Sequence, residues 1–195
     1  MDLVERALDI ILRPREAWPV IGRERSGVRD LYRSYAAILA AIPAAAHFVG
    51  MTVIGISFIG IRYRAPFRGA LGYAIVSYCL SLLGLYLFAL VIDGLASRFD
   101  SARSLENAMK LSVYSSTPYW VAGVLFIIPT LASIALLLSL YGFYLLYVGL
   151  PVLMNTPTER RPLYFVALVA VRLLISAVAS LFTGFFFPQG RMGVI

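Results

Sequence analysis

Apolar positions gather into five long stretches, and the short segments between them carry nearly all of the charges. A helix needs about 20 residues to cross roughly 30 Å of hydrocarbon, so stretches of this length are typical of membrane spans. The predicted spans are residues 35–61, 69–92, 111–128, 130–154 and 163–187. The pattern therefore predicts an all-α, polytopic membrane protein with five transmembrane helices and short amphipathic interfacial helices.

The third stretch allows two interpretations, because it is short and contains Pro118. It is either a kinked span or one half of a re-entrant helical pair that turns at Pro129 and continues into the fourth stretch. Pro118 removes an amide donor, so we expect a bend in the helix and a carbonyl near Tyr114 that lacks its usual partner.

The segment before the first span has the periodicity of an amphipathic helix. Val4, Ala7, Leu8 and Ile11 share one face, acids and arginines share the other, and Pro14 ends the pattern. Such a helix either lies along the inner interface with Trp18 as an anchor, or caps the bundle. A second interfacial helix is expected in the loop 93–110. The predicted organisation is a cytoplasmic segment 1–34, a transmembrane domain 35–187 and a short outer tail 188–195.

Composition excludes a soluble domain, since 61% of the 195 residues are hydrophobic and 14% are charged, against about 25% in soluble domains. The single cysteine, Cys79, falls in an apolar run, where we expect it to pack as a small hydrophobe. The arginine-rich N-terminus lacks the apolar core of a cleavable signal.

The net charge of +7 comes from sixteen arginines and one lysine, spread over short segments between apolar stretches. This distribution is typical of membrane topology signals and not of a nucleic-acid-binding face. Five spans with the N-terminus inside place twelve of these cations on the cytoplasmic side and four outside. We therefore predict an inner N-terminus and an outer C-terminus.

Residues 108–151 begin with Ala-Met-Lys-Leu-Ser-Val-Tyr-Ser-Ser-Thr-Pro-Tyr-Trp and end with Leu-Tyr-Gly-Phe-Tyr-Leu-Leu-Tyr-Val-Gly-Leu-Pro. This sequence closely resembles the bacterial branch of the Yip family of five-span membrane proteins. The N-terminal Leu12, Pro14, Arg15, Glu16, Ala17 and Trp18 also look like the opening of bacterial members. The resemblance implies a bacterial inner (plasma) membrane protein with five helices, a cytoplasmic N-terminus and an outer C-terminus.

Eukaryotic relatives act in early secretory trafficking and associate with prenylated small GTPases. Some of them carry Asp-Leu-Tyr-Gly-Pro ahead of the first span. Asp30, Leu31 and Tyr32 look similar, but Arg33 and Ser34 stand where Gly and Pro would be. The departure argues against small-GTPase binding by this chain.

Arg172 and His47 are the ionisable residues inside the predicted spans. A charge in mid-membrane costs roughly 2.5 to 3.5 kcal/mol on insertion scales, so Arg172 needs a partner or water. We expect it to lie against protein, within reach of His47, Asp93 or the hydroxyl run 114–117. Counting about 1.5 Å per residue places Arg172 about 15 Å and His47 about 18 Å from the same side. Arg172 is predicted either to form a polar site for an anion, a lipid headgroup or a proton, or to snorkel to the interface. Asp93 is expected to pair with Lys110 or Arg172, or simply to end its helix in water.

Further ligand-binding or lipid-binding candidates are hydroxyl residues next to a proline and tyrosines in a row: Tyr114, Ser115, Ser116, Thr117, Pro118, Tyr141 and Tyr144. Hydroxyls before Pro118 either satisfy freed backbone carbonyls or face a ligand. Tyr141, Tyr144 and Tyr147 form an aromatic stripe. Small-residue pairs at four-residue spacing predict helix contacts: Ala40 with Ala44, Ala41 with Ala45, and Ser77 with Ser81.

Patterns typical of enzymes and metal sites are missing from the sequence: there is no second histidine, no cysteine cluster and no phosphate-binding glycine loop. We therefore expect no catalysis, no cofactor and no metal. The predicted function is a membrane scaffold or organiser that binds lipids, other membrane proteins or further copies of itself. The alternative is a small transporter or channel with a polar intramembrane site around Arg172 and His47.

Overall fold

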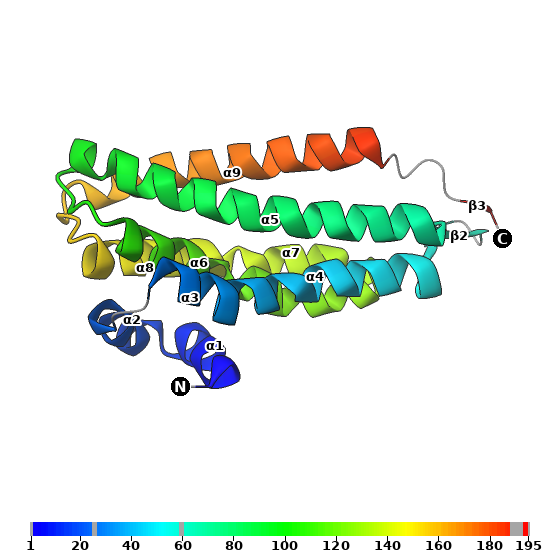
Figure 1. The fold of residues 1–195 in the computed structure, drawn as a ribbon, viewed down its shortest axis with the longest axis horizontal. Coiled ribbons are helices and arrows are strands. Elements are labelled where there is room, and N and C mark those ends of the chain that lie inside the picture. The colour runs from blue at the N-terminus through cyan, green and yellow to red at the C-terminus, as the bar shows by residue number, and fades with distance from the viewer. Residues whose placement is uncertain (1, 25–26, 59–60, 188–192, 195) are drawn as a thin grey trace.

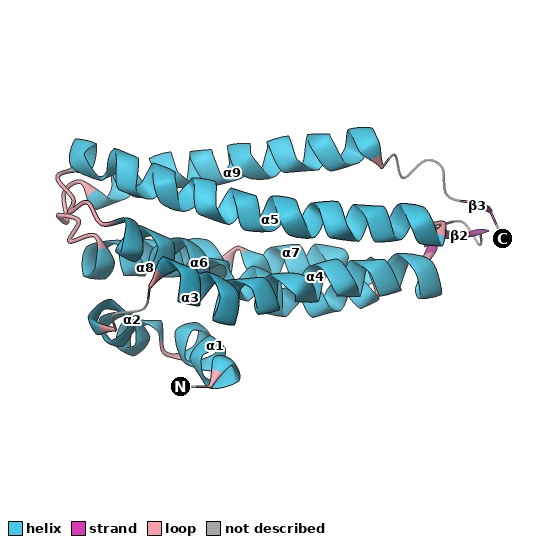
Figure 2. Cartoon of the chain, in the orientation of Figure 1, coloured by secondary structure: helices cyan, strands magenta, loops and turns pink. Residues whose placement is uncertain are grey.

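The computed structural model describes residues 2–24, 27–58, 61–187 and 193–194 as a bundle of helices along one axis, with a small sheet at one end (Figures 1 and 2). The helices are α1 (Leu3–Leu12), α2 (Pro14–Arg23), α3 (Val28–Leu31), α4 (Ala37–Val49), α5 (Phe67–Ala96), α6 (Leu105–Ala122), α7 (Ala132–Ser139), α8 (Tyr141–Leu153) and α9 (Arg161–Phe186). The strands are β1 (Ile56–Phe58), β2 (Ile61–Arg64) and β3 (Gly193–Val194). The described fold is thus predominantly α, as predicted.

Short turns extend several helices. The π-helical turns Tyr32–Ala36 and Gly50–Ile54 continue α4 at its two ends, the 3-10 turn Ser97–Phe99 follows α5, and the 3-10 turns Gly123–Ile127 and Pro129–Leu131 connect α6 to α7. Counting these turns, four segments are long and apolar enough to cross a membrane: Val28–Ile54, Phe67–Phe99, Pro129–Leu153 and Arg161–Phe186. They correspond to the first, second, fourth and fifth predicted spans.

The third predicted span corresponds to α6, which is the central helix of the bundle. It packs against α4, α5, α7 and α8, and 13 of its 18 residues are buried. A helix surrounded by protein can carry polar side chains, which explains why α6 is not among the long apolar segments. The five-span count is therefore not confirmed by length and composition. Pro118 lies inside α6, not in its first turn, and the expected bend stays a prediction.

A helix in the second half of the loop 93–110 is confirmed, since α6 begins at Leu105 and runs on into the third predicted span, but its interfacial placement is wrong, because this start is buried in the bundle. Ser104 caps that start by accepting a hydrogen bond from the Asn107 amide at 3.3 Å. Ala108 and Met109 are fully buried. The polar appearance of this stretch reflects a helix start held by tertiary contacts.

The N-terminal helices α1 and α2 lie against the bundle near its loop-rich end, opposite the sheet (Figure 1). Ala7 and Ile10 of α1 face the bundle, whereas Val4, Leu8 and Leu12 are exposed. Trp18 is fully buried and meets the Tyr114 ring edge-on at 6.2 Å between centroids. The prediction of Trp18 as an interface anchor is therefore wrong, because this ring belongs to the core.

The first helical segment ends earlier than residue 61. Gly55 has a φ of 73°, a backbone conformation that favours glycine, and it separates the helix from β1. The sheet is antiparallel in the order β1-β2-β3, with Ile56 opposite Tyr63 and Tyr63 opposite Val194. It therefore brings the C-terminal strand to the α4–α5 connection.

Candidate functional site

Arg172 lies on α9, and its half-buried side chain reaches into the bundle. Its Nη2 donates a hydrogen bond to Ser116 Oγ on α6 at 2.9 Å, and its Cζ lies 5.2 Å from the centre of the Phe88 ring on α5. The expected contact between Arg172 and the hydroxyl run is confirmed. Among the described residues, no carboxylate pairs with this guanidinium.

A groove of about 470 Å³ opens beside Arg172 between α5, α6, α9 and the α7–α8 junction, and we call it the Arg172 groove. Its polar lining consists of one guanidinium and a set of hydroxyl side chains: Arg172, Tyr73, Ser77, Ser81, Ser115, Ser116, Tyr119, Ser139, Ser176, Ser180 and Thr183. This volume lies within the range of about 300 to 1,000 Å³ that is usual for ligand sites.

The mouth of the groove lies between α7 and α9. Helix α9 packs on α5 and α8, and α7 packs on α6, but α7 and α9 have no substantial contact in the described part of the chain. Leu136, Leu140 and Leu173 line the groove and are each more than half exposed. The groove thus combines a polar wall with apolar lips that face outward from the bundle.

The hydroxyl run before Pro118 divides between two sides of α6. Ser115 and Ser116 line the groove, and both donate to the Ser112 carbonyl, at 3.2 and 2.8 Å. Thr117 is buried on another side, with Oγ1 3.0 Å from the Tyr35 hydroxyl. The hydroxyls therefore bind the backbone, as predicted, but at Ser112 and not at Tyr114.

His47 and Asp93 do not meet Arg172. The His47 ring stacks on Tyr73 with centroids 4.7 Å apart, so it contacts a residue that lines the groove without lining the groove itself. Asp93 pairs with Arg103 at 3.2 Å, which makes the expected pairing with Lys110 or Arg172 wrong. Arg103, in the loop that follows α5, takes the place of both predicted partners.

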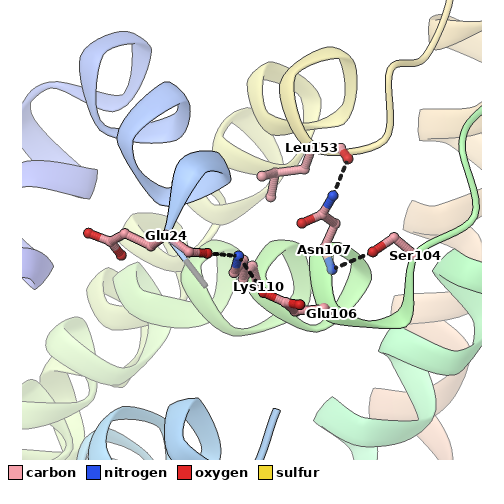
Figure 3. Close-up of polar contacts among 6 residues, drawn as sticks. All are labelled: Glu24, Ser104, Glu106, Asn107, Lys110 and Leu153. Carbon is pink, nitrogen blue, oxygen red and sulfur yellow. Dashed lines mark hydrogen bonds and ion pairs between the residues drawn. The ribbon is translucent and has the colours of Figure 1, made fainter. Parts of the chain in front are cut away.

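Lys110 forms a second buried cationic cluster, near the N-terminal helices (Figure 3). Its side chain is 1% exposed, its Nζ donates to the Glu24 carbonyl, and it lies 2.9 Å from Glu106 Oε1. Asn107 Nδ2 donates to the Leu153 carbonyl at 2.9 Å. The Glu24 carboxylate in turn pairs with the buried Arg6. These contacts join α1, α2, α6 and α8.

Tyr141 and Tyr144 lie outside the lining of the Arg172 groove. Their ring centres are 5.3 Å apart, and the Tyr141 hydroxyl donates to the Ile11 carbonyl at 2.9 Å. Tyr147 packs edge-on against Phe165. The predicted aromatic packing is confirmed, whereas a ligand-binding role for these tyrosines stays a prediction.

Sequence reasoning missed most of the groove. Ser176, Ser180 and Thr183 follow Arg172 at helical spacing on one face of α9, a signal that was visible in the sequence. Ser77 and Ser81 were predicted to mark a helix contact but line the groove instead. Ala40 is buried as expected, whereas Ala41 and Ala45 are exposed. Cys79 is also exposed and does not pack inside.

Two residues of the Asp30-Leu31-Tyr32 element belong to the fold itself. Leu31 is buried, and the Tyr32 hydroxyl donates to the Leu82 carbonyl of α5. Asp30 is exposed. The element therefore anchors the start of the first long segment to its neighbour.

The long apolar helices define a multi-pass helical membrane protein, and the hydroxyl-lined groove lies within its bundle. The chain belongs to the Yip1 family, since the Yip1 domain matches residues 8–180. It is similar to the inner membrane protein YohC of Escherichia coli (strain K12), with 27% identity over 169 residues that cover 85% of this chain and 87% of YohC. YohC from Escherichia coli O6:H1 (strain CFT073) matches to the same extent. No solved structure matches the chain.

The family and the spans agree with the resemblance noted from residues 108–151. The chain is a multi-pass inner membrane protein of this family.

Proposed function

We propose that this protein is a non-catalytic organiser of the inner membrane that binds lipid in the Arg172 groove. One observation carries the proposal: a half-buried guanidinium, whose hydrogen-bond partner within the described part of the chain is Ser116, stands in a hydroxyl-lined groove inside the membrane-spanning bundle. A charge at such depth is costly unless it has a partner, and an anionic ligand supplies one.

The amphipathic character of the groove favours a lipid over a free solute. Arg172 offers donors to a headgroup, while the exposed Leu136, Leu140 and Leu173 offer contacts to acyl chains. A lateral mouth between α7 and α9 suits a molecule that arrives from the bilayer and not along the bundle axis.

The proposal includes five crossings, with α6 and the turn Gly123–Ile127 as the third. Eighteen helical residues at 1.5 Å and a five-residue 3-10 turn at 2 Å give about 37 Å, enough to cross. The cation bias supports a cytoplasmic segment 1–34 and an outer tail 188–195 around a transmembrane domain 35–187. Reporter fusions at both ends test this topology, and two cytoplasmic termini would contradict it.

A small transporter is the second candidate, favoured by the row of hydroxyls from Arg172 to Thr183 along α9. Such a row offers successive partners to a moving solute. Contacts with other membrane proteins or with further copies of the chain are also proposed, because the outward face of α9 is apolar and exposed. Flux assays in sealed proteoliposomes separate the transporter from the organiser.

A matched pair of variants on α9 tests lipid binding. Ser180→Phe fills the groove, whereas Val178→Phe adds the same ring to an exposed position that does not line it. We expect mass spectrometry of protein purified from native membranes to find the bound lipid depleted with Ser180→Phe and retained with Val178→Phe. Equal lipid content in both variants would contradict the proposed function.

A further inference from the structure

The polar lining of the Arg172 groove lies in one half of the bundle. On α5 the groove runs from Tyr73 to Phe88, on α6 from Ser115 to Tyr119, and on α9 from Arg172 to Thr183. The start of α5 and the ends of α6 and α9 point toward the sheet (Figure 1). The groove therefore belongs to the half that carries the C-terminal strand, and Arg172 stands at its inner limit.

The other half of the bundle closes the groove below Arg172. Leu168, one helical turn before Arg172, is fully buried, and Phe88 beneath the guanidinium is 1% exposed. Further along, the Tyr164 hydroxyl donates to the carbonyl of the buried Ile92. Apolar packing thus separates Arg172 from the N-terminal helices.

The donors at the inner limit suit an oxyanion with several oxygens. Phe88 lies against the guanidinium, Ser116 takes one of its N–H groups, and further N–H groups remain for a ligand. Guanidinium forks bind phosphate through parallel hydrogen bonds, so Arg172 supplies the donors at this limit. Ser115 and Ser116 give their own protons to the Ser112 carbonyl. No carboxylate lines the groove in the described residues, so an anion meets no repulsion there.

From this arrangement we infer that the Arg172 groove is a one-sided binding site for a phosphate-bearing oxyanion, entered only from the half of the membrane that holds the C-terminal strand. The inference rests on the proposed function and deepens it by naming the ligand chemistry and the direction of entry. A phospholipid headgroup and free phosphate share this chemistry.

Direction of entry is tested by thiol labelling in a Cys79→Ser background, which removes the exposed native thiol. Ser176→Cys and Ser180→Cys report the groove, and Ser97→Cys reports the opposite end of the bundle. In sealed vesicles of both orientations, a membrane-impermeant maleimide should label the groove cysteines from one side and Ser97→Cys from the other. Labelling of all three from the same side would overturn one-sided entry.

Ligand chemistry is tested on delipidated protein in an uncharged detergent, with the labelling rate of Ser176→Cys as the readout. Protection by inorganic phosphate identifies a free anion as ligand, and protection only by phosphatidylglycerol identifies a headgroup. Arg172→Gln should weaken protection by about tenfold or more, and Arg172→Lys should restore part of it. Ser116→Ala, with an expected loss of about fivefold, serves if the arginine variant does not fold.

The outcomes separate this inference from the proposed function. If Ser180→Phe strips lipid but neither phosphate nor phosphatidylglycerol protects the thiol, lipid binding stands and the phosphate site is wrong. If phosphate protects the thiol but Ser180→Phe retains every lipid, the phosphate site stands and the lipid-binding function is wrong.

Discussion

Two regions of the bundle each place a cationic side chain on or against α6, and the two cations differ in their partners. Near the N-terminal helices, Lys110 is 1% exposed and its ammonium is met by the Glu24 carbonyl and the Glu106 carboxylate. In the sheet-side half, Arg172 has Ser116 as its hydrogen-bond partner and lines an open groove.

The difference shows how to read a charge inside a membrane protein. A buried cation whose donors are used within the chain holds elements together, since removing it leaves acceptors without partners. A cation with spare donors beside a hollow has little role in packing and is available to a ligand. Lys110 is fully buried and Arg172 is half-buried, but the partners of each cation are what assign its role.

Packing around the N-terminal helices should be the most sensitive feature of the Lys110 region. Trp18→Ala removes a fully buried ring that contacts Tyr114. We expect the free energy of unfolding to fall by about 3 to 5 kcal/mol, the usual cost of a large core truncation. Denaturant titration in detergent, followed by circular dichroism, measures it. Val20→Ala on the exposed side of α2 is the control, and equal stability of the two variants would refute a structural role for this region.

Lys110→Met should lower the free energy of unfolding by about 2 kcal/mol, because the Glu24 carbonyl loses its buried donor. The same titration measures this change, and limited proteolysis should detect release of the segment before residue 28. Arg98→Met, at an exposed position, is the control. If the Lys110→Met protein kept the stability and protease resistance of the unmodified protein, Lys110 would have no structural role and would not differ from Arg172.

Thr117→Val should cost about 1 kcal/mol, the value of one buried hydrogen bond, here to the Tyr35 hydroxyl. Thr117 faces away from the groove, so the Thr117→Val protein should bind as much lipid as the unmodified protein does. Thr130→Val at an exposed position controls for the loss of a hydroxyl. Lipid loss with Thr117→Val would mean that the two sides of α6 are not separate.

Local sequence patterns predicted the long apolar helices better than the buried start of α6. The helices α5 and α9 begin and end within a few residues of the predicted 69–92 and 163–187, because uninterrupted apolar runs are a strong signal. The start of α6 was predicted as an interfacial helix and not as a buried one, because Lys110 looks like a charge at the membrane surface. Its partner Glu24 lies 86 residues earlier, and no local pattern contains that contact.

The candidate site was predictable in part for the same reason. The cost of a charge in mid-membrane singled out Arg172, and the hydroxyl run named Ser116 among its expected partners. The rest of the groove depends on α7 and α9 standing apart, which is a property of packing and not of either helix alone. His47 was predicted to share the level of Arg172, but its ring stacks on Tyr73, whereas Arg172 lies against Phe88 of the same helix α5. At 1.5 Å per residue, these two contacts are about 22 Å apart along the bundle.

Arg172→Met gives the smallest expected change in stability and the clearest test of the comparison. The substitution forfeits one hydrogen bond to Ser116, but it also relieves the desolvation of a buried charge, and a methionine of similar length fills the space. We therefore expect the free energy of unfolding in lipid-free detergent to change by less than about 1 kcal/mol, in contrast to Lys110→Met. The Arg172→Met protein purified from native membranes should nevertheless lose its bound lipid. The apolar lips remain, but the guanidinium that binds the headgroup is gone. Unfolding titrations and lipid mass spectrometry on the same preparations check both halves of this expectation. Destabilisation as large as that of Lys110→Met, with lipid retained, would make Arg172 a structural cation like Lys110.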